Sequence, residues 1–169
     1  DRLLADLAEL SAIGKYETGV HRPSLSPEHL ACCRWLSAKL EAIGHTVSMD
    51  GIGNVLGRSP ATGNILLGGS HLESQNHAGR LDGPLGVLYA LEAARALNEQ
   101  HPGATCGIDV AAWCDEEGHF GSFLGSRSFV GHVAEAEIDA AVDRTLGRTM
   151  RAALATAGLS GVPRLMVEP

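Results

Sequence analysis

Hydrophobic residues recur at helical spacing in several parts of the chain. Leu3, Leu7 and Leu10 lie on one stripe near the start of the sequence, as expected for an amphipathic helix. Ser26 and Pro27 provide an N-cap residue followed by proline at the first helical position, and Gly44 is a typical C-terminal stop. Five segments are predicted to be helices: 1–13, 27–43, 86–100, 123–131 and 148–159.

Short apolar runs between these segments predict β-strands. Segments 45–50 and 54–59 flank the turn Asp50-Gly51, which is typical of a hairpin. Segments 65–70 and 106–117 are continuous apolar runs, as expected for strands that are buried on both faces. Strand–helix–strand alternation therefore predicts an α/β domain with a largely parallel core sheet.

Length and charge narrow the class of protein. The chain has 169 residues, which predicts one domain, and its composition is ordinary for a soluble protein. A net charge of −7 argues against nucleic acid as a partner. No apolar run is long enough for a membrane span, and no signal peptide is visible, so neither a membrane partner nor export is expected. The expected location is the cytoplasm.

The four cysteines do not have the spacing of a zinc site. Cys32 and Cys33 are adjacent in a predicted helix, and Cys106 and Cys114 lie in a predicted strand. None forms a CxxC pair, so we interpret all four as small core residues in a reducing compartment.

Residues with metal chemistry follow two of the predicted strands. His71 comes directly after segment 65–70, and Glu116 and Glu117 end segment 106–117. Ligands bind beyond the carboxyl ends of the strands in open α/β sheets, so these side chains would converge if the strands are parallel neighbours. Asp82 lies just before a predicted helix, where a carboxylate suits a cap.

His71, Asp82 and Glu117 together offer a nitrogen and oxygen donor set that suits zinc, manganese or cobalt. Asp82 is the candidate bridge between two metals, and Glu116 is then free to act as a base. The spacing alone leaves a simpler alternative open, in which His71 is a structural histidine and Asp82-Gly83 an ordinary turn.

The ordered motifs GSHLES, GRLDGPLG and DEEGHFGSFLGSR are similar to those of a known enzyme family. Together with GVHRPSLSPEH and GNVLGR, they resemble the di-metal amidohydrolases related to aminoacylase. The similar branch contains N-carbamoyl-L-amino-acid hydrolases, β-ureidopropionases and allantoate amidohydrolases. The resemblance implies a three-layer, zinc-aminopeptidase-like catalytic domain, of which residues 1–169 would be the N-terminal portion without the lid domain.

The resemblance also implies roles for individual residues. His71 matches a metal ligand, Asp82 the metal-bridging carboxylate, and Glu117 a further ligand. Glu116 matches the general base, which would deprotonate a metal-bound water that attacks a small-molecule amide or ureido substrate. Two divalent ions are expected, zinc or manganese, with cobalt and nickel as alternatives. The bond between Asp82 and Gly83 matches one that the family often holds in the cis form.

Three features depart from the family pattern. Glu73 replaces an aspartate whose carboxylate orients the ligand imidazole, and we expect Glu73 to act in the same way on His71. His119 lies where an arginine is usual and is either a substrate or metal contact or a plain loop histidine. Two further ligand histidines of the family have no counterpart in residues 1–169. They would come from a longer chain or from a second chain, and the family further implies a homodimer formed through the lid.

The remaining histidines are predicted to be solvated, and nothing in the spacing of His77 requires it to be a ligand. The predicted solvated residues are His21, His29, His45, His101 and His132. Two other functions stay open at this point. One is a di-metal aminoacylase or exopeptidase, and the other is a catalytically silent metal-binding fragment.

Overall fold

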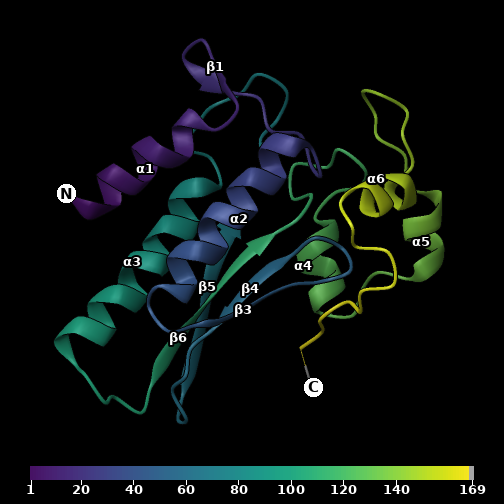
Figure 1. Cartoon of the computed structure of the whole chain (residues 1–169). Coiled ribbons are helices and arrows are strands. Elements are labelled where there is room, and N and C mark those ends of the chain that lie inside the picture. Colours follow the sequence, from purple (N-terminus) through teal and green to yellow (C-terminus); the bar gives the residue numbers. More distant parts are fainter. Residues whose placement is uncertain (168–169) are drawn as a thin grey trace.

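A four-stranded mixed sheet forms the centre of the computed structural model, which describes residues 1–167 (Figure 1). Its strands lie in the order β3-β4-β6-β5. Their bounds are Thr46–Met49 for β3, Val55–Arg58 for β4, Ile65–His71 for β5 and Gly107–Trp113 for β6. β3 and β4 form the antiparallel hairpin that was predicted around Asp50-Gly51. Glu168 and Pro169, the end of the predicted domain, lie outside the described residues.

The prediction of a largely parallel sheet is wrong for this part of the protein. β5 pairs with β6 in parallel, whereas β4 pairs with both β3 and β6 in antiparallel orientation. The hairpin turn forces β4 to run against β3, and the crossover helix between β5 and β6 allows those two strands to run together. The one parallel pair is the pair that carries the candidate site.

Two helices, α2 (Pro27–Glu41) and α3 (Pro84–Gln100), cover one face of the sheet (Figure 1). α2 contacts β3 and β4, and α3 contacts β5 and β6. α1 (Arg2–Ala12) packs against α3. α2 begins as predicted, because the Ser26 hydroxyl accepts a hydrogen bond from the backbone N–H of His29 at 3.1 Å. The main core lies between these helices and the sheet and includes Leu10, Leu36, Leu40, Val55, Leu72, Leu88, Leu91 and Val110.

Three short helices form a second apolar cluster beyond the carboxyl end of the sheet. They are α4 (Leu124–Phe129), α5 (Glu135–Ala140) and α6 (Met150–Thr156). Trp113 points away from α3, and its ring centre lies 5.0 Å from that of Phe129 in α4. Helices therefore contact both faces at this end, in agreement with the expected layered α/β class. α5 and the small hairpin of β1 (Lys15–Tyr16) and β2 (Gly19–Val20) were not predicted, because each is too short for a clear period.

Strand β5 is not buried on both faces, so this prediction is wrong. Ile65, Leu66 and Leu67 are 41%, 68% and 40% exposed. Within the described part of the chain β5 is one of the two edge strands of this sheet, and α3 packs on its later residues, where Gly68 faces Ala90. The apolar run correctly indicated a strand, but its position in the sheet depends on long-range pairing.

The cysteine prediction holds for three residues and fails for one. Cys32, Cys33 and Cys114 are buried, whereas Cys106 is exposed because it precedes the first residue of β6 and lies outside the sheet. All four thiols are free. None of the helices within residues 1–167 has both the length and the apolar character that crossing a membrane requires.

Candidate metal centre

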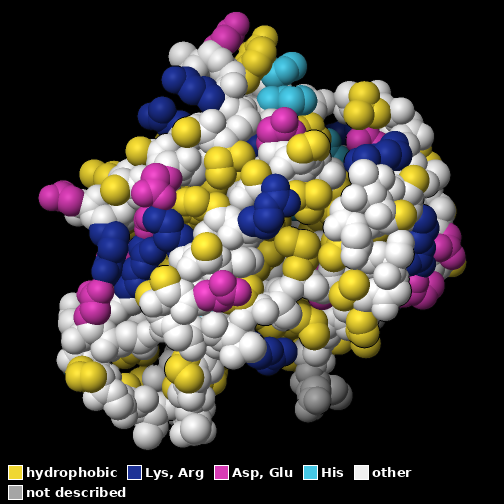
Figure 2. All heavy atoms as spheres, viewed as in Figure 1, with side chains coloured by type: hydrophobic (Ala, Val, Ile, Leu, Met, Phe, Trp, Pro, Cys, Tyr) yellow, Lys and Arg dark blue, Asp and Glu magenta, His cyan; other side chains and the backbone are white. Residues whose placement is uncertain are grey.

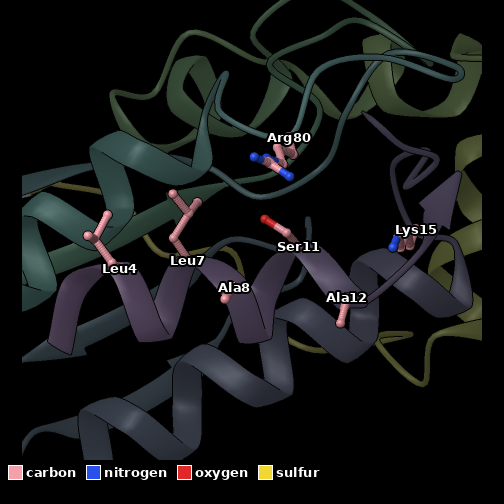
Figure 3. A pocket seen from close by; sticks show the side chains of 7 residues that line it. All are labelled: Leu4, Leu7, Ala8, Ser11, Ala12, Lys15 and Arg80. Carbon is pink, nitrogen blue, oxygen red and sulfur yellow. The ribbon is translucent and has the colours of Figure 1, made fainter. Parts of the chain in front are cut away.

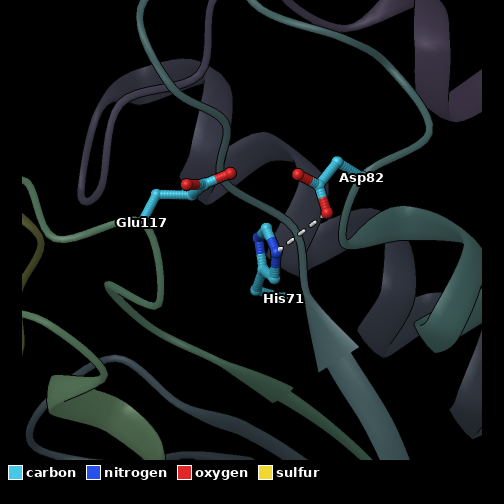
Figure 4. Close-up of side chains that lie close together, drawn as sticks. All are labelled: His71, Asp82 and Glu117. Carbon is cyan, nitrogen blue, oxygen red and sulfur yellow. Dashed lines mark ion pairs between the residues drawn. The ribbon is translucent and has the colours of Figure 1, made fainter.

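The parallel pairing of β5 and β6 brings the predicted residues to one edge of the sheet. His71 of β5 pairs with Trp113 of β6. Glu116 and Glu117 lie three and four residues after Trp113. One donor atom from each of His71, Asp82 and Glu117 lies within 4.8 Å of the others. Figure 4 shows the three side chains converging from the end of β5, the loop before α3 and the loop after β6. The predicted convergence is therefore present.

His71 is oriented as a metal ligand requires. Its Nδ1 lies 3.0 Å from the carbonyl oxygen of Glu73, and a carbonyl can only accept, so Nδ1 carries the proton. The lone pair is then on Nε2, which faces Oδ1 of Asp82 at 3.9 Å. The imidazole is only 12% exposed, so the ring is held by its surroundings. A neutral imidazole with its second nitrogen bound to a carbonyl is the usual form of a histidine ligand.

Asp82 does not cap α3, in contrast to what its position suggested. The N-cap residue is Gly83, and the Asp82 side chain is 82% exposed. The peptide bonds of the described backbone are all trans, so the cis bond that the resemblance implied is also not found at Asp82–Gly83. Gly83 instead turns the chain through a positive φ of 84°, which turns Asp82 toward His71 while α3 begins.

The loop after β6 is organised around the buried carboxylate of Asp115. This residue has a φ of 63°, and its carboxylate accepts hydrogen bonds from the Ser24 hydroxyl at 2.7 Å and from three backbone N–H groups. Those donors belong to His119, Phe120 and Gly121. Asp115 is therefore a structural residue, and its contacts fix the loop that carries Glu116 and Glu117.

Glu73 contacts the site differently from the expected aspartate. Its Oε1 accepts a hydrogen bond from the backbone N–H of Glu116 at 2.6 Å and lies 3.8 Å from Nδ1 of His71. The extra methylene thus carries the carboxylate past the imidazole to the β6 loop, and the carbonyl of Glu73 orients the ring instead. Complete burial raises the pKa of the Glu73 carboxyl to about 8.

One contact of Glu117 was missed by the sequence reasoning. Gln75 Nε2 lies 2.6 Å from Oε2 of Glu117, and the Gln75 amide oxygen accepts a hydrogen bond from Arg144 at 2.6 Å. Neither residue carries a periodic or motif signal, because a glutamine and an arginine in polar loops are common. Arg144 also lies 69 positions from Gln75, so only the folded chain brings them together.

Two histidines that were predicted to be solvated are buried. His29 is 1% exposed and His45 is 5% exposed, because each has a partner inside the fold. His45 Nε2 donates to the carbonyl of Ile108 at 2.8 Å. The prediction holds for His101 and His132, which are exposed, while His21 is half-buried.

His119 and His77 are not part of the candidate ligand group. His119 is buried, and its Nε2 donates to the carbonyl of Ser74 at 2.9 Å, which makes it a structural loop residue. His77 is exposed and its ring packs against those of Tyr16 and His21, with centres 4.0 and 4.4 Å apart. Figure 2 shows histidine side chains gathered on the surface beside β1. His77 therefore belongs to a surface cluster of rings and not to the candidate ligand group.

Burial of His29 predicts a measurable dependence of stability on pH. Its Nδ1 accepts from the backbone N–H of Leu25 at 3.0 Å, and burial lowers its pKa to about 3. Because the folded pKa lies below the ordinary value of 6.5, folding favours the neutral ring. The stabilisation is complete above pH 6.5 and is lost as the pH falls toward 3. Between pH 7.5 and 4.5 the wild type should lose about 2–3 kcal/mol more unfolding free energy than His29→Gln.

Urea unfolding at a series of pH values measures this difference. The exposed His101 provides the matched control, because His101→Gln should retain the wild-type slope. Equal slopes in wild type and His29→Gln would contradict the assignment of His29 as a buried neutral residue.

A separate groove beside α1 does not carry the candidate chemistry. It has a volume of about 380 Å³, and Figure 3 shows its lining between α1 and the loop that carries Arg80. The lining residues are Leu4, Leu7, Ala8, Ser11, Ala12, Lys15 and Arg80. It includes none of the three candidate ligands, so we place the site at the sheet edge.

Sequence and structure comparisons show which known proteins this chain is similar to. The family model of peptidase family M28 matches residues 52–157, which is more than half of the chain. An N-carbamoyl-L-amino-acid amidohydrolase from Paenarthrobacter aurescens is 36% identical over 94% of this chain and 40% of its own length. An allantoate deiminase from Arabidopsis thaliana is 33% identical over 78% of this chain and 26% of its own.

The chain is also similar to a solved structure. A crystal structure of a hydantoinase/carbamoylase family amidase from Burkholderia phymatum matches with a TM-score of 0.94 and 45% identity. The match covers 99% of this chain and 41% of that one. The chain thus spans about 40% of the length of the Paenarthrobacter aurescens amidohydrolase and of the Burkholderia phymatum amidase. The resemblance read from the motifs is confirmed, as is the predicted α/β class, although the sheet is mixed and not largely parallel.

Proposed function

Because the chain belongs to peptidase family M28, we propose that it forms part of a metal-dependent hydrolase of linear amide or ureido C–N bonds. The observation that carries this proposal is the convergence of His71, Asp82 and Glu117 beside Glu116. The relatives include N-carbamoyl-L-amino-acid amidohydrolases and allantoate deiminases, which favours a small carbamoyl or ureido substrate. The whole protein's substrate and activity are proposals, since the chain spans only part of these relatives.

The donor set fits a divalent cation. His71 directs its Nε2 toward Asp82 while its Nδ1 contacts the Glu73 carbonyl, and Asp82 and Glu117 add two carboxylates, a combination that suits zinc, manganese, cobalt and nickel. We propose that His71, Asp82 and Glu117 would hold part of a site for two divalent ions. When bound, such ions polarise the substrate carbonyl and make water acidic enough to attack at neutral pH. The remaining ligands would come from other parts of the complete protein or from a second chain.

Glu116 is proposed as the general base. Its backbone N–H is held by Glu73 at 2.6 Å, and its Oε1 is buried without a hydrogen-bond partner in the described part of the chain. An unpaired buried carboxylate oxygen on the residue that directly precedes Glu117 is suited to accept a proton from the attacking water. After the water oxygen has bonded to the carbonyl carbon, Glu116 would return the proton to the leaving nitrogen as the C–N bond breaks.

A cytoplasmic location and a homodimer stay predictions.

The proposal is tested on the complete gene product by elemental analysis together with turnover of three substrate classes. These classes are N-carbamoyl amino acids, N-acetyl amino acids and dipeptides. Bound divalent metal and fastest turnover of the carbamoyl or a related ureido compound would support the proposal. Faster turnover of acetyl amino acids or dipeptides would favour the aminoacylase or exopeptidase alternative. Metal without turnover of any ureido or amide compound would favour the catalytically silent alternative, and absence of metal would contradict the site.

A further inference from the structure

We propose that Gln75 and Arg144 position the carboxylate of Glu117 for the cation, an inference that rests on the proposed metal site. Gln75 lies on the loop that follows β5, and Arg144 lies on the turn between α5 and α6. Neither belongs to the three-residue donor group, so both would act through Glu117.

Both the nitrogen and the oxygen of the Gln75 side-chain amide form hydrogen bonds. Its Nε2 donates to the Glu117 carboxylate at 2.6 Å and to the Glu117 backbone carbonyl at 3.0 Å. Its Oε1 accepts from a guanidinium nitrogen of Arg144 at 2.6 Å. The same nitrogen of Arg144 also donates to the carbonyl of Glu117 at 3.0 Å. Backbone and side chain of Glu117 are thus held by one glutamine.

Arg144 determines the orientation of the Gln75 side-chain amide. A guanidinium has donors and no acceptor, so it requires the amide oxygen and not the amide nitrogen. With Oε1 turned to Arg144, the two Nε2 protons must face Glu117. They occupy its carbonyl and one carboxylate oxygen, Oε2, which leaves the second carboxylate oxygen for a cation.

The turn that carries Arg144 is itself anchored to the site loops. The backbone N–H of Arg144 donates to the carbonyl of His119 at 3.0 Å, and Asn76 donates to the Thr145 hydroxyl at 2.9 Å. The buried Asp143 closes the turn by accepting from the backbone N–H groups of Thr145 and Leu146. Arg144 therefore has a fixed starting point from which its side chain reaches Gln75.

A neutral amide is the suitable group for this position. An arginine or lysine directly on Glu117 would offset the negative charge that attracts a cation, whereas glutamine fixes the carboxylate and leaves its charge in place. The guanidinium of Arg144 binds the amide oxygen of Gln75 and the backbone carbonyl oxygen of Glu117, and it does not bind the carboxylate.

Binding of Mn²⁺ alone to the complete gene product tests the inference by titration calorimetry. Gln75→Met keeps the size and removes the donor, and should weaken Mn²⁺ binding by about 10- to 100-fold. Arg144→Met should weaken it less, and the loss in the double variant should be smaller than the sum of the two single losses, because Arg144 acts mainly through Gln75. Arg144→Lys keeps a donor and should restore part of the loss. Arg58→Met, on an exposed arginine of β4, should bind like the wild type.

A second measurement separates positioning from general loss of structure. In the metal-free protein, the Gln75 side-chain amide protons should exchange slowly with solvent, and their NMR shifts should change in Arg144→Met. Fast exchange in the wild type would overturn the inference. Wild-type Mn²⁺ affinity in Gln75→Met would also overturn it and leave the proposed function standing. Failure of the wild-type protein to bind Mn²⁺ would overturn the proposed metal site, and the inference with it.

Discussion

Glu116→Gln is expected to lower kcat for the proposed ureido substrate by about a thousandfold while the metal content stays unchanged. The substitution keeps the shape of the side chain and removes its ability to accept a proton. Its backbone N–H would still bind Glu73, so the loop after β6 should keep its conformation. Because Glu116 lies outside the group formed by His71, Asp82 and Glu117, its charge is not needed to hold the cation.

Elemental analysis and steady-state kinetics on the complete gene product check both parts of this expectation. Glu41→Gln, which alters an exposed glutamate at the end of α2, should match the wild type in both measurements. A loss of metal in Glu116→Gln would show that Glu116 is a ligand. A kcat within tenfold of the wild type would show that it is not the base.

The part of the site that sequence reasoning predicted is the part that local rules determine. An apolar run marks where a strand ends, and a histidine or a glutamate pair directly after it must lie at the sheet edge. His71 follows this rule as the last residue of β5, but β6 ends at Trp113 and not at Glu117 as predicted, so Glu117 lies in the loop four residues later. The parallel pairing of β5 and β6 also had to be assumed. The start of α2 was predictable for a similar reason, because Ser26 and Pro27 act on neighbouring backbone groups.

The features that were wrong or missed depend on pairing between distant segments. Nothing local to segment 65–70 shows that β5 is an edge strand of the described sheet. The burial of His29 and His45 depends on partners brought by the fold, such as Ile108 for His45. The redirection of the Glu73 carboxylate has the same origin, because its new partner, the Glu116 N–H, lies 43 positions away.

Gly83→Ala should weaken Mn²⁺ binding by about a hundredfold and should lower the unfolding free energy by about 1–2 kcal/mol. Gly83 has a φ of 84°, which costs a residue with a Cβ atom roughly 1–2 kcal/mol. A Cβ atom here would also lie 2.5 Å from Nδ1 of His71, too close for either group to stay in place. The imidazole can rotate away, so the fold survives, but rotation breaks the bond from Nδ1 to the Glu73 carbonyl and turns Nε2 from Asp82.

Gly79→Ala provides a control in the same loop, because a Cβ atom at Gly79 would meet nothing within 4 Å and its φ is not in the left-handed region. It should change the unfolding free energy by less than about 0.5 kcal/mol and leave Mn²⁺ affinity unchanged. Titration calorimetry and urea unfolding separate the two effects in both variants. If Gly83→Ala loses stability but binds Mn²⁺ like the wild type, the orientation of His71 does not matter to the cation, and His71 is not a ligand. A large loss of affinity with a small loss of stability would instead link the turn before α3 directly to the chemistry of the site.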